Sequence, residues 1–294
     1  MIICHQASEL HQLLNTYRRE GKSIALVPTM GNLHRGHVRL IEKAVDLADI
    51  VVSSIFVNPM QFGRHEDLDK YPRTPDADIE KLTAAGCAVL FAPSVKEMYP
   101  LGLDEHTVVS VPAISARHCG ASRPGHFDGV ATVVSKLFNL VKPDHAVFGL
   151  KDYQQFKVIR KMNADMCFGI QLTGVATERD ENGLALSSRN GYLSAAEKHT
   201  ALTIIQTLRS TAAQIENGMR DFAALEQAAK SVFESRQMRP DYFSICRADT
   251  LAPASADDKQ LVILAAAYVG TTRLIDNIEI NLQHRGHHLM GQGK

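Results

Sequence analysis

Short apolar segments rich in β-branched residues alternate with amphipathic segments through the first half of the chain, and this alternation constrains the fold most. The apolar segments cover residues 24–27, 50–57, 88–91, 108–111 and 146–148, and the amphipathic ones cover 37–48, 75–85 and 129–141. Strands that are apolar along nearly their whole length are typical of parallel sheets covered by helices on both faces. The sequence therefore predicts a doubly wound parallel α/β sheet.

The pattern changes after about residue 173. A polar stretch at 177–182 leads into two alanine-rich helical patterns, and strand-like segments joined by turns follow them. The helical patterns cover 194–215 and 221–236, and the strand-like segments cover 242–246, 261–268 and 272–280. These features predict a smaller α+β domain in which a helical pair packs on an antiparallel sheet.

We therefore expect a first domain at residues 1–175, a C-terminal domain at 176–283 and a tail at 284–294. The tail carries His284, His287 and His288. These histidines could bind a metal, but a frayed polar terminus is the simpler interpretation.

Charge and cysteine content exclude several classes of protein. Lys plus Arg and Asp plus Glu each number 32 in the 294 residues, so nothing favours nucleic acid or an anionic membrane as the main partner. The five cysteines show no CxxC or Cys/His ligand spacing, which is typical of reduced thiols. The first residues do not resemble a signal peptide, and no stretch has the ~18 apolar residues of a membrane span. A cytoplasmic location is expected.

The stretch from Pro28 to His37 lies between the first apolar strand and the next helix, where open α/β sheets bind ligands. His34 and His37 are three residues apart at the helix start, where exposed N–H groups favour phosphate, and Gly31 and Gly36 allow close approach. Histidines at this spacing could also form a zinc pair, although no HExxH pattern or third ligand accompanies them. Neither a Walker loop nor a GxGxxG motif is present.

Four more motifs follow in order at residues 56–62, 122–134, 148–155 and 184–190. In isolation, the Asn58-Pro59 pair at the end of a strand is more typical of turn chemistry than of a site. Together with the HxGH sequence of residues 34–37, however, the five motifs resemble the pantoate–β-alanine ligase family, a branch of the HxGH nucleotidyltransferases related to class I aminoacyl-tRNA synthetases. The resemblance covers residues 24–193 and continues more weakly to Ile280.

The resemblance implies a Rossmann-like fold and an ATP-dependent condensation of (R)-pantoate with β-alanine in the biosynthesis of pantothenate, a coenzyme A precursor. Pantoyl adenylate would be the intermediate, and AMP and pyrophosphate would be released. The cofactors implied are ATP and Mg²⁺, with Mg²⁺ bound mainly through ATP and no dedicated protein metal site. The resemblance also implies a homodimer, and the C-terminal domain would act as a lid that excludes water.

The resemblance also assigns roles to individual residues. The ATP-binding residues would be Met30, Gly31, Asn32, Leu33, His34, Arg35, Gly36, His37, Gly149, Leu150, Lys151, Asp152, Glu178, Leu186, Ser187, Ser188 and Arg189. Those that bind pantoate or β-alanine would be Asn58, Gln61, Phe62, Arg123 and Gln155, with Arg123 also expected to help with pyrophosphate.

Four of these residues, His34, His37, Lys151 and Arg189, are the expected catalytic residues. His37 matches the family's proton donor, yet adenylation of an ionised carboxylate needs little proton transfer. We therefore expect both imidazoles mainly to stabilise charge on the phosphates. Lys151 should matter most for rate, because charge accumulates near the α-phosphate as pyrophosphate leaves.

Some assignments stay open at this level. Leu150 and Glu178 depart from the family's usual residues, which puts the adenine-side contact of Glu178 in doubt. Asp152 could act through a Mg²⁺ shell or a ribose contact, and His126 could anchor a loop or take part in catalysis. Two rival functions are a nucleotidyltransferase that stops at a nucleotidyl product and an inactive α/β scaffold. The Gln61 and Gln155 contexts argue against the first, and the four expected catalytic residues argue against the second.

Overall fold

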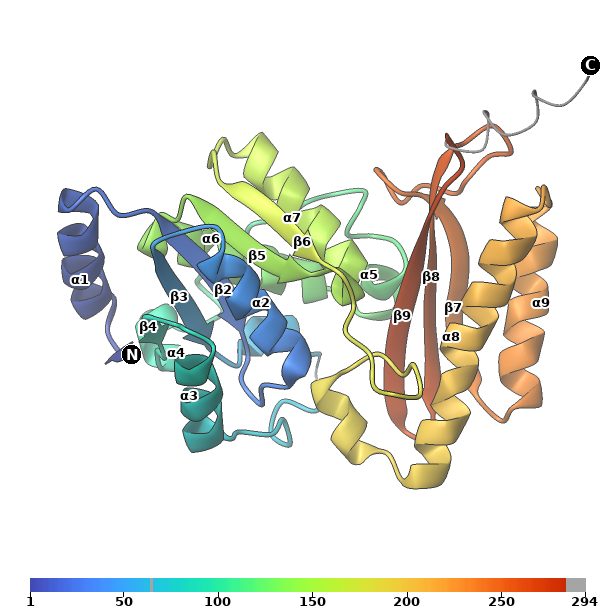
Figure 1. The fold of residues 1–294 in the computed structure, drawn as a ribbon, viewed down its shortest axis with the longest axis horizontal. Helices are drawn as coiled ribbons and strands as arrows, with labels where there is room; N and C mark the ends of the chain where they lie inside the picture. Colours follow the sequence, from blue (N-terminus) through green and yellow to red (C-terminus); the bar gives the residue numbers. More distant parts are fainter. Residues whose placement is uncertain (64–65, 284–294) are drawn as a thin grey trace, which may run out of the picture. The chain divides into compact units, whose positions relative to one another are not determined.

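The computed structural model describes residues 1–63 and 66–283, which form two compact units (Figure 1). Unit 1 consists of Met1–Arg179 and Leu186–Ser188, and unit 2 consists of Asp180–Ala185 and the described residues from Arg189 onward. The predicted tail at 284–294, with its three histidines, lies outside the described residues.

Unit 1 is built on a six-stranded sheet in which every pair of neighbouring strands is parallel. The strands are β1 (Ile2–Cys4), β2 (Ile24–Thr29), β3 (Ile50–Ile55), β4 (Val89–Phe91), β5 (His145–Gly149) and β6 (Gln171–Val175), in the spatial order β1-β4-β3-β2-β5-β6. The predicted doubly wound parallel sheet is confirmed, and β1 and β6 are strands that the apolar pattern did not reveal.

Helices cover the sheet of unit 1. They are α1 (Ala7–Arg19), α2 (Arg35–Val45), α3 (Pro75–Ala84), α4 (Val95–Met98), α5 (Cys119–Ser122), α6 (His126–Val141) and α7 (Tyr153–Asp165). Helix α2 packs on β2, β3 and β5, so Leu40, Ile41 and Ala44 join Ala25 and Val27 in one buried cluster. Alternate residues of β2 enter this cluster because successive side chains of a strand point to opposite faces of its sheet.

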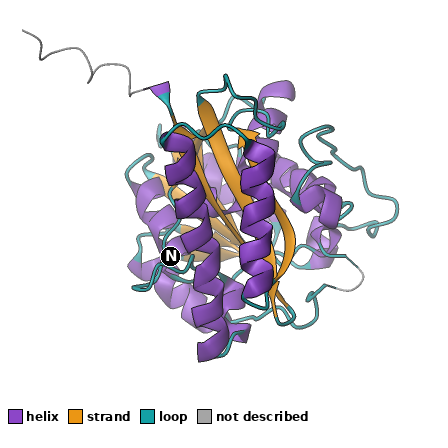
Figure 2. Cartoon of the chain, turned by 90° about the vertical axis from the view of Figure 1, so that its right-hand side faces the viewer, coloured by secondary structure: helices purple, strands orange, loops and turns teal. Residues whose placement is uncertain are grey.

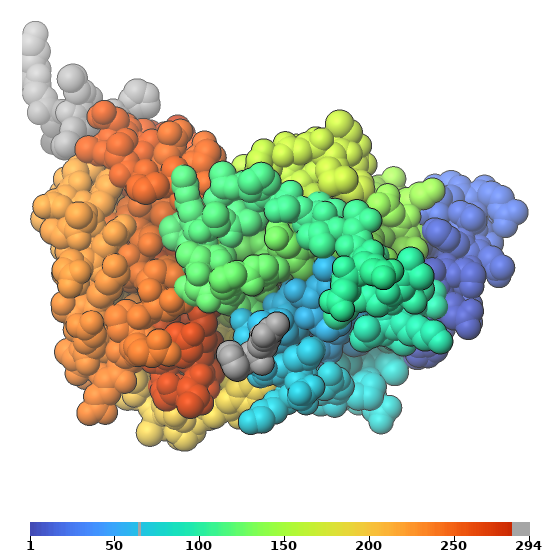
Figure 3. All heavy atoms as spheres, turned by 180° about the vertical axis from the view of Figure 1, so that it is seen from behind, coloured from blue at the N-terminus to red at the C-terminus, as the bar shows by residue number. Residues whose placement is uncertain are grey.

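The strand predicted at residues 108–111 is wrong. These residues are irregular and belong to the connection between α4 and α5, where Val108 is 52% exposed. The backbone N–H of Val109 donates to the Thr132 hydroxyl at 2.9 Å instead of to a neighbouring strand. In Figure 3 this green segment spreads over an outer surface of unit 1. A short apolar run carries no information about whether a partner strand exists.

Unit 2 contains two long helices, α8 (Ala195–Glu216) and α9 (Phe222–Ser235), and the antiparallel strands β7 (Arg239–Arg247), β8 (Gln260–Val269) and β9 (Thr272–Asn281). Figure 2 shows the two helices side by side over one face of this sheet. Ile204 and Leu208 of α8 share a buried core with Ile263 and Ala265 of β8. The predicted helical pair on a small antiparallel sheet is confirmed.

Helix α8 begins with the signal expected from its sequence. Ser194 Oγ accepts from the backbone N–H of Glu197 at 3.3 Å, and the Glu197 carboxylate accepts from the backbone N–H of Ser194 at 2.8 Å. This reciprocal pairing is a capping box, which satisfies two helix-end donors. Throughout the described part of the chain, each helix is too short or too polar to span a lipid bilayer.

Candidate active site

The strand order creates a switch point between β2 and β5. β3 and β4 lie on one side of β2, whereas β5 and β6 lie on the other. The segments after β2 and β5 therefore leave the sheet side by side at its carboxyl edge, where ligands bind in open α/β sheets. The first segment is the HxGH loop, and the second is the 3-10 turn η2 (Leu150–Asp152).

The two histidines of the HxGH loop cap the start of α2. His34 Nδ1 accepts from the backbone N–H of Gly36 at 3.1 Å, and His37 Nδ1 accepts from the backbone N–H of His34 at 3.3 Å. The ring centroids are 4.1 Å apart. Because each Nδ1 accepts a hydrogen bond, each ring carries its proton on Nε2 and can donate it to a ligand.

Both imidazoles are neutral at pH 7. Desolvation, aided by the nearby Lys151 ammonium, lowers the pKa of His34 to about 4. Desolvation and then the neighbouring His34 lower the pKa of His37 to about 3. The start of α2 thus offers two neutral N–H donors, together with the positive end of the helix dipole, to an anion.

The loop before α2 is held from behind by Asp78 of α3. This carboxylate is 1% exposed and accepts from the backbone N–H groups of Asn32 and Leu33 at 2.9 and 2.7 Å. Gly31 adopts a φ of +82°, and a Cβ there would lie 3.1 Å from Asp78 Oδ2. The sequence showed Asp78 only as part of a helix, so this anchor was missed.

Lys151 and Asp152 reach the same edge from η2. Lys151 Nζ lies 3.9 Å from Asp152 Oδ1, and the Asp152 side chain is 49% exposed. The Lys151 charge contributes to lowering the pKa of both histidines, which places its ammonium near their rings. The structure therefore brings together three of the four expected catalytic residues. Arg189 belongs to unit 2, and its role stays a prediction.

The two departures from the family pattern have local explanations. The Leu150 side chain packs over Gly174 of β6, where an added Cβ would lie 2.5 Å from Leu150 Cδ2. The Glu178 carboxylate lies 3.5 Å from Arg35 Nε and 3.4 Å from Arg39 Nε, while its backbone C=O accepts from the Leu186 N–H at 2.9 Å.

The segment 186–188 lies against the HxGH loop. Ser188 Oγ donates to the Asn32 C=O at 3.3 Å, and Asn32 Nδ2 donates to the Ser188 C=O at 3.4 Å. Two predicted ATP segments far apart in the sequence are therefore neighbours in unit 1.

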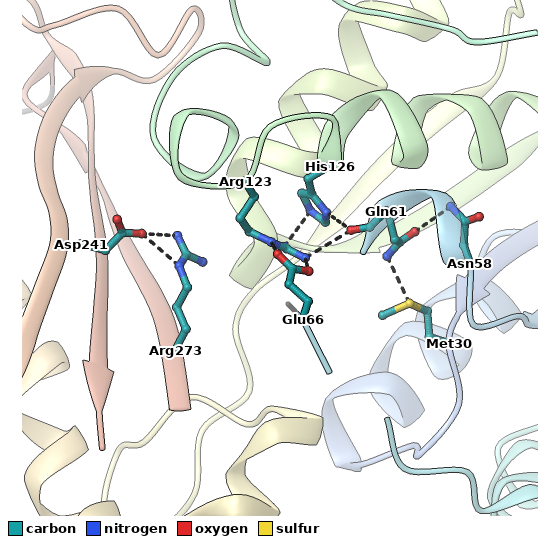
Figure 4. Close-up of polar contacts among 8 residues, drawn as sticks. All are labelled: Met30, Asn58, Gln61, Glu66, Arg123, His126, Asp241 and Arg273. Atoms are coloured by element: carbon teal, nitrogen blue, oxygen red, sulfur yellow. Dashed lines mark hydrogen bonds and ion pairs between the residues drawn. The ribbon is translucent and has the colours of Figure 1, made fainter. Parts of the chain in front are cut away.

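Three of the residues expected to bind pantoate or β-alanine, Asn58, Gln61 and Phe62, lie after β3, in or beside the turn η1 (Pro59–Gln61). Asn58 Nδ2 donates to Gln61 Oε1 at 3.1 Å, and Gln61 Nε2 lies 3.1 Å from the Met30 sulfur (Figure 4). The Phe62 ring packs edge-on against Tyr71, with centroids 5.9 Å apart. The Met30 contact links this group to the HxGH loop.

The structure separates the roles of two adjacent glutamines on α7. Gln155 is partly buried, whereas Gln154 is 4% exposed and bonded to the loop before α5. Gln154 Oε1 accepts from the Cys119 N–H at 3.0 Å, and Nε2 donates to two loop carbonyls at 2.9 and 2.7 Å. Gln154 is thus a loop anchor that sequence reasoning did not assign.

Arg123 is engaged by Glu66, a residue that the motifs did not identify. Its guanidinium donates to both Glu66 carboxylate oxygens, at 2.6 and 2.5 Å (Figure 4). This bidentate pair occupies two donors of the guanidinium with a protein carboxylate.

His126 anchors the same region. Its Nδ1 lies 2.8 Å from the Gln61 C=O, which can only accept, and its Nε2 lies 3.0 Å from Arg123 Nη1. Desolvation, followed by the Arg123 charge, lowers the pKa of His126 to about 4. Both ring nitrogens therefore have protein partners, which favours loop anchoring over catalysis.

We expect acidification from pH 7 to pH 5 to destabilise the protein partly through His126. Its folded pKa of about 4 lies below the ordinary 6.5, so between these values the unfolded chain binds a proton at His126 and the folded chain does not. The stability that the neutral His126 contributes is fully present above pH 6.5 and is lost as the pH falls towards 4. The loss at pH 5 is about 2 kcal/mol by the pKa difference.

Urea unfolding at pH 7 and pH 5 checks this prediction. His126→Gln supplies a neutral N–H and a carbonyl oxygen that do not titrate, so it should lose less stability than the wild type. Equal losses in the two proteins would contradict the prediction.

The fold and this edge define a doubly wound α/β protein with a histidine-capped helix start at its switch point. A family model described as pantoate-beta-alanine ligase matches residues 2–279. The chain belongs to this family, as predicted from its motifs.

Curated relatives and solved structures agree. The chain is 56% identical to the pantothenate synthetase of Marinobacter nauticus, over 94% of this chain and 98% of the relative, and 55% identical to that of Hahella chejuensis, over 96% and 100%. A crystal structure of pantothenate synthetase from Thermus thermophilus matches with a TM-score of 0.89 at 41% identity, over 96% and 100% of the two chains. The Francisella tularensis pantoate-beta-alanine ligase, complexed with beta-gamma ATP and beta-alanine, matches with a TM-score of 0.80 at 34% identity, over 95% and 97%.

Proposed function

We propose that this protein is an ATP-dependent ligase that joins pantoate to β-alanine at the carboxyl edge of the parallel sheet, through a pantoyl adenylate. The observation that carries the proposal is the grouping of His34, His37 and Lys151 at the switch point. Membership of the pantoate–β-alanine ligase family supports it, as does the relative with ATP and β-alanine ligands in its crystal structure.

In the first step, the pantoate carboxylate attacks the α-phosphorus of ATP, and pyrophosphate leaves. His34 and His37 donate hydrogen bonds from their Nε2–H groups to phosphate oxygens. This role requires no proton transfer. The Lys151 ammonium offsets charge that grows as the bond to pyrophosphate breaks. Charge stabilisation of this kind accelerates a reaction because it is stronger in the transition state than in the ground state.

In the second step, the amine of β-alanine attacks the activated carbonyl, and AMP leaves. Gln61 and Gln155 hold pantoate for both steps, and Phe62 bounds the same pocket. Arg123 is the cation for a carboxylate or pyrophosphate near this pocket, and ligand binding there competes with Glu66 for its guanidinium. Each side chain acts by binding or by charge, and none becomes a covalent nucleophile.

The residues present fit a Mg²⁺ ion that is shared with ATP. Among the described residues, no three His, Cys, Asp or Glu side chains gather closely enough to hold a metal by themselves. Asp152, with its half-exposed carboxylate beside Lys151, would supply one oxygen, and the remaining ligands would be phosphate oxygens and water. When bound, Mg²⁺ neutralises charge on the leaving pyrophosphate. A ribose contact is the alternative role of Asp152.

Incubation of the protein with MgATP and pantoate, with and without β-alanine, tests the function. We expect pyrophosphate when pantoate is present, and AMP with pantothenate once β-alanine is added. A nucleotidyl product that persists with β-alanine present would favour the rival nucleotidyltransferase. The absence of any ATP cleavage would favour an inactive scaffold.

We further propose that the protein is a homodimer in the cytoplasm. The location rests on the cysteines, all five of which are free thiols, with Cys4, Cys87, Cys119 and Cys246 buried. The dimer rests on the family resemblance. Light scattering at working concentration should give twice the chain mass of 32.3 kDa, and a monomeric mass would contradict this.

A further inference from the structure

Asn58 is more deeply buried than we expect for a side chain that contacts the substrate. It is 1% exposed, and the hydrogen-bonding positions of its carboxamide are occupied by protein groups. Nδ2 donates to the Gly129 C=O at 3.0 Å and to Gln61 Oε1 at 3.1 Å, while Oδ1 accepts from the Tyr99 hydroxyl at 2.7 Å and from the Met60 N–H at 3.4 Å. Two donors and two acceptor positions are the full capacity of an amide, so none is left for pantoate.

These contacts allow only one orientation of each amide. The Gly129 C=O can only accept, so the nitrogen of Asn58 must face it. The second N–H of the same nitrogen then points at Gln61, which must present its oxygen there. The Gln61 nitrogen is consequently turned the other way, towards Met30 (Figure 4).

Tyr99 and Gly129 hold this arrangement from two sides. Burial raises the pKa of Tyr99, so its hydroxyl stays protonated and donates, and its ring packs against Phe56 and His106 with centroids 6.1 and 4.8 Å away. A Cβ at Gly129 would lie 2.4 Å from the Met60 oxygen and 2.6 Å from the Gln61 nitrogen of the backbone. Only glycine lets the first turn of α6 approach η1 so closely.

We propose that Tyr99, Asn58 and Gly129 are positioning residues that fix the Gln61 carboxamide as a donor towards the substrate. The inference rests on the proposed function, in which Gln61 binds pantoate. Gln61 then selects an acceptor oxygen of pantoate, a carboxylate or hydroxyl oxygen. Its own oxygen faces the Asn58 amide nitrogen, so the nitrogen is the end of the carboxamide that is presented to pantoate.

Tyr99→Phe is the mildest test because it removes one hydroxyl and keeps the ring. Asn58 Oδ1 would retain only the 3.4 Å contact to Met60, so the Gln61 amide should be held less firmly. We expect the KM for pantoate to rise about 3- to 10-fold, the effect of one buried hydrogen bond. The KM for ATP should stay close to wild type, and the melting temperature should fall by no more than about 4 °C. Tyr17→Phe makes the same chemical change at a partly buried tyrosine on α1 and is the control.

Asn58→Asp is the stronger test because it inverts the hydrogen-bonding pattern. A carboxylate cannot donate to Gln61 Oε1, so the Gln61 amide should rotate, give its nitrogen to the new carboxylate and turn its oxygen to the substrate. We expect the KM for pantoate to rise by about 50-fold or more, since an acceptor would face an acceptor. Pantoate-dependent exchange of pyrophosphate into ATP isolates the first step, and the melting temperature reports on folding.

The outcomes separate the two proposals. If the wild type lacks pantoate-dependent exchange, the proposed function fails. If the wild type is active but Tyr99→Phe leaves the KM for pantoate unchanged, the positioning role is overturned. Equal rises of the KM values for pantoate, ATP and β-alanine with a lower melting temperature would show a purely structural role and would also overturn it.

Discussion

Lys151→Ala should lower the rate of pantoyl adenylate formation by about 10²- to 10³-fold, the range found when one pre-organised charge-stabilising group is removed. Lys151 lies in the turn after β5, and its ammonium is the lysine charge that lowers the pKa of His34 and His37 most. The two imidazoles cannot replace it, because their low pKa values keep them uncharged at neutral pH. The loss should therefore appear in the chemical step and only weakly in substrate binding.

Single-turnover measurement of pyrophosphate release, with enzyme in excess over ATP, checks this prediction. Lys161→Ala is the matched control: Lys161 lies on the following helix, its side chain is 48% exposed, and it pairs with Asp165 at 2.7 Å. The control should keep the wild-type rate. Adenylate formation at the wild-type rate in Lys151→Ala would refute the role of Lys151.

Asp78→Asn should weaken ATP binding and the stability of unit 1 together. The carboxylate accepts two backbone N–H groups of the loop through its two oxygens, and an amide would turn an NH₂ towards one of them. A buried donor left facing a donor costs about 1–3 kcal/mol. Since Asn32 and Leu33 lead directly into the His34 cap, we expect the KM for ATP to rise at least about 10-fold.

Denaturation and ATP titration of two variants check this second prediction. Asp76→Asn lies on the same helix, is exposed, and removes the same charge without touching the loop. It should match the wild type in both measurements. Wild-type affinity for ATP in Asp78→Asn would show that the loop keeps its shape without the anchor.

The sequence was most informative about features that depend only on residues within one segment. Apolar runs and amphipathic periods revealed β2, β3, α2 and the elements of unit 2 to within a few residues, because each reflects spacing along a single segment. The apolar run at 108–111 was misleading, because these residues form no strand. The motifs at strand ends revealed the HxGH loop and the Lys151 turn, since parallel strands bring their carboxyl ends to one edge.

The partners of those motifs required the three-dimensional structure. Asp78 is 46 residues from Asn32, Tyr99 is 41 from Asn58, and Glu66 is 57 from Arg123. No local pattern distinguishes these side chains from ordinary helix or loop residues. They are identified only by what the fold places beside them.

The amino-acid sequence by itself therefore determined the fold class, the family and the segments proposed to carry the chemistry, because these depend on residue types at short, fixed spacings. The tertiary structure alone decided the protonation of the histidines, the direction of the Gln61 amide and the engagement of Arg123 by Glu66. Those properties depend on desolvation and on hydrogen bonds between distant segments, which arise only when the chain has folded.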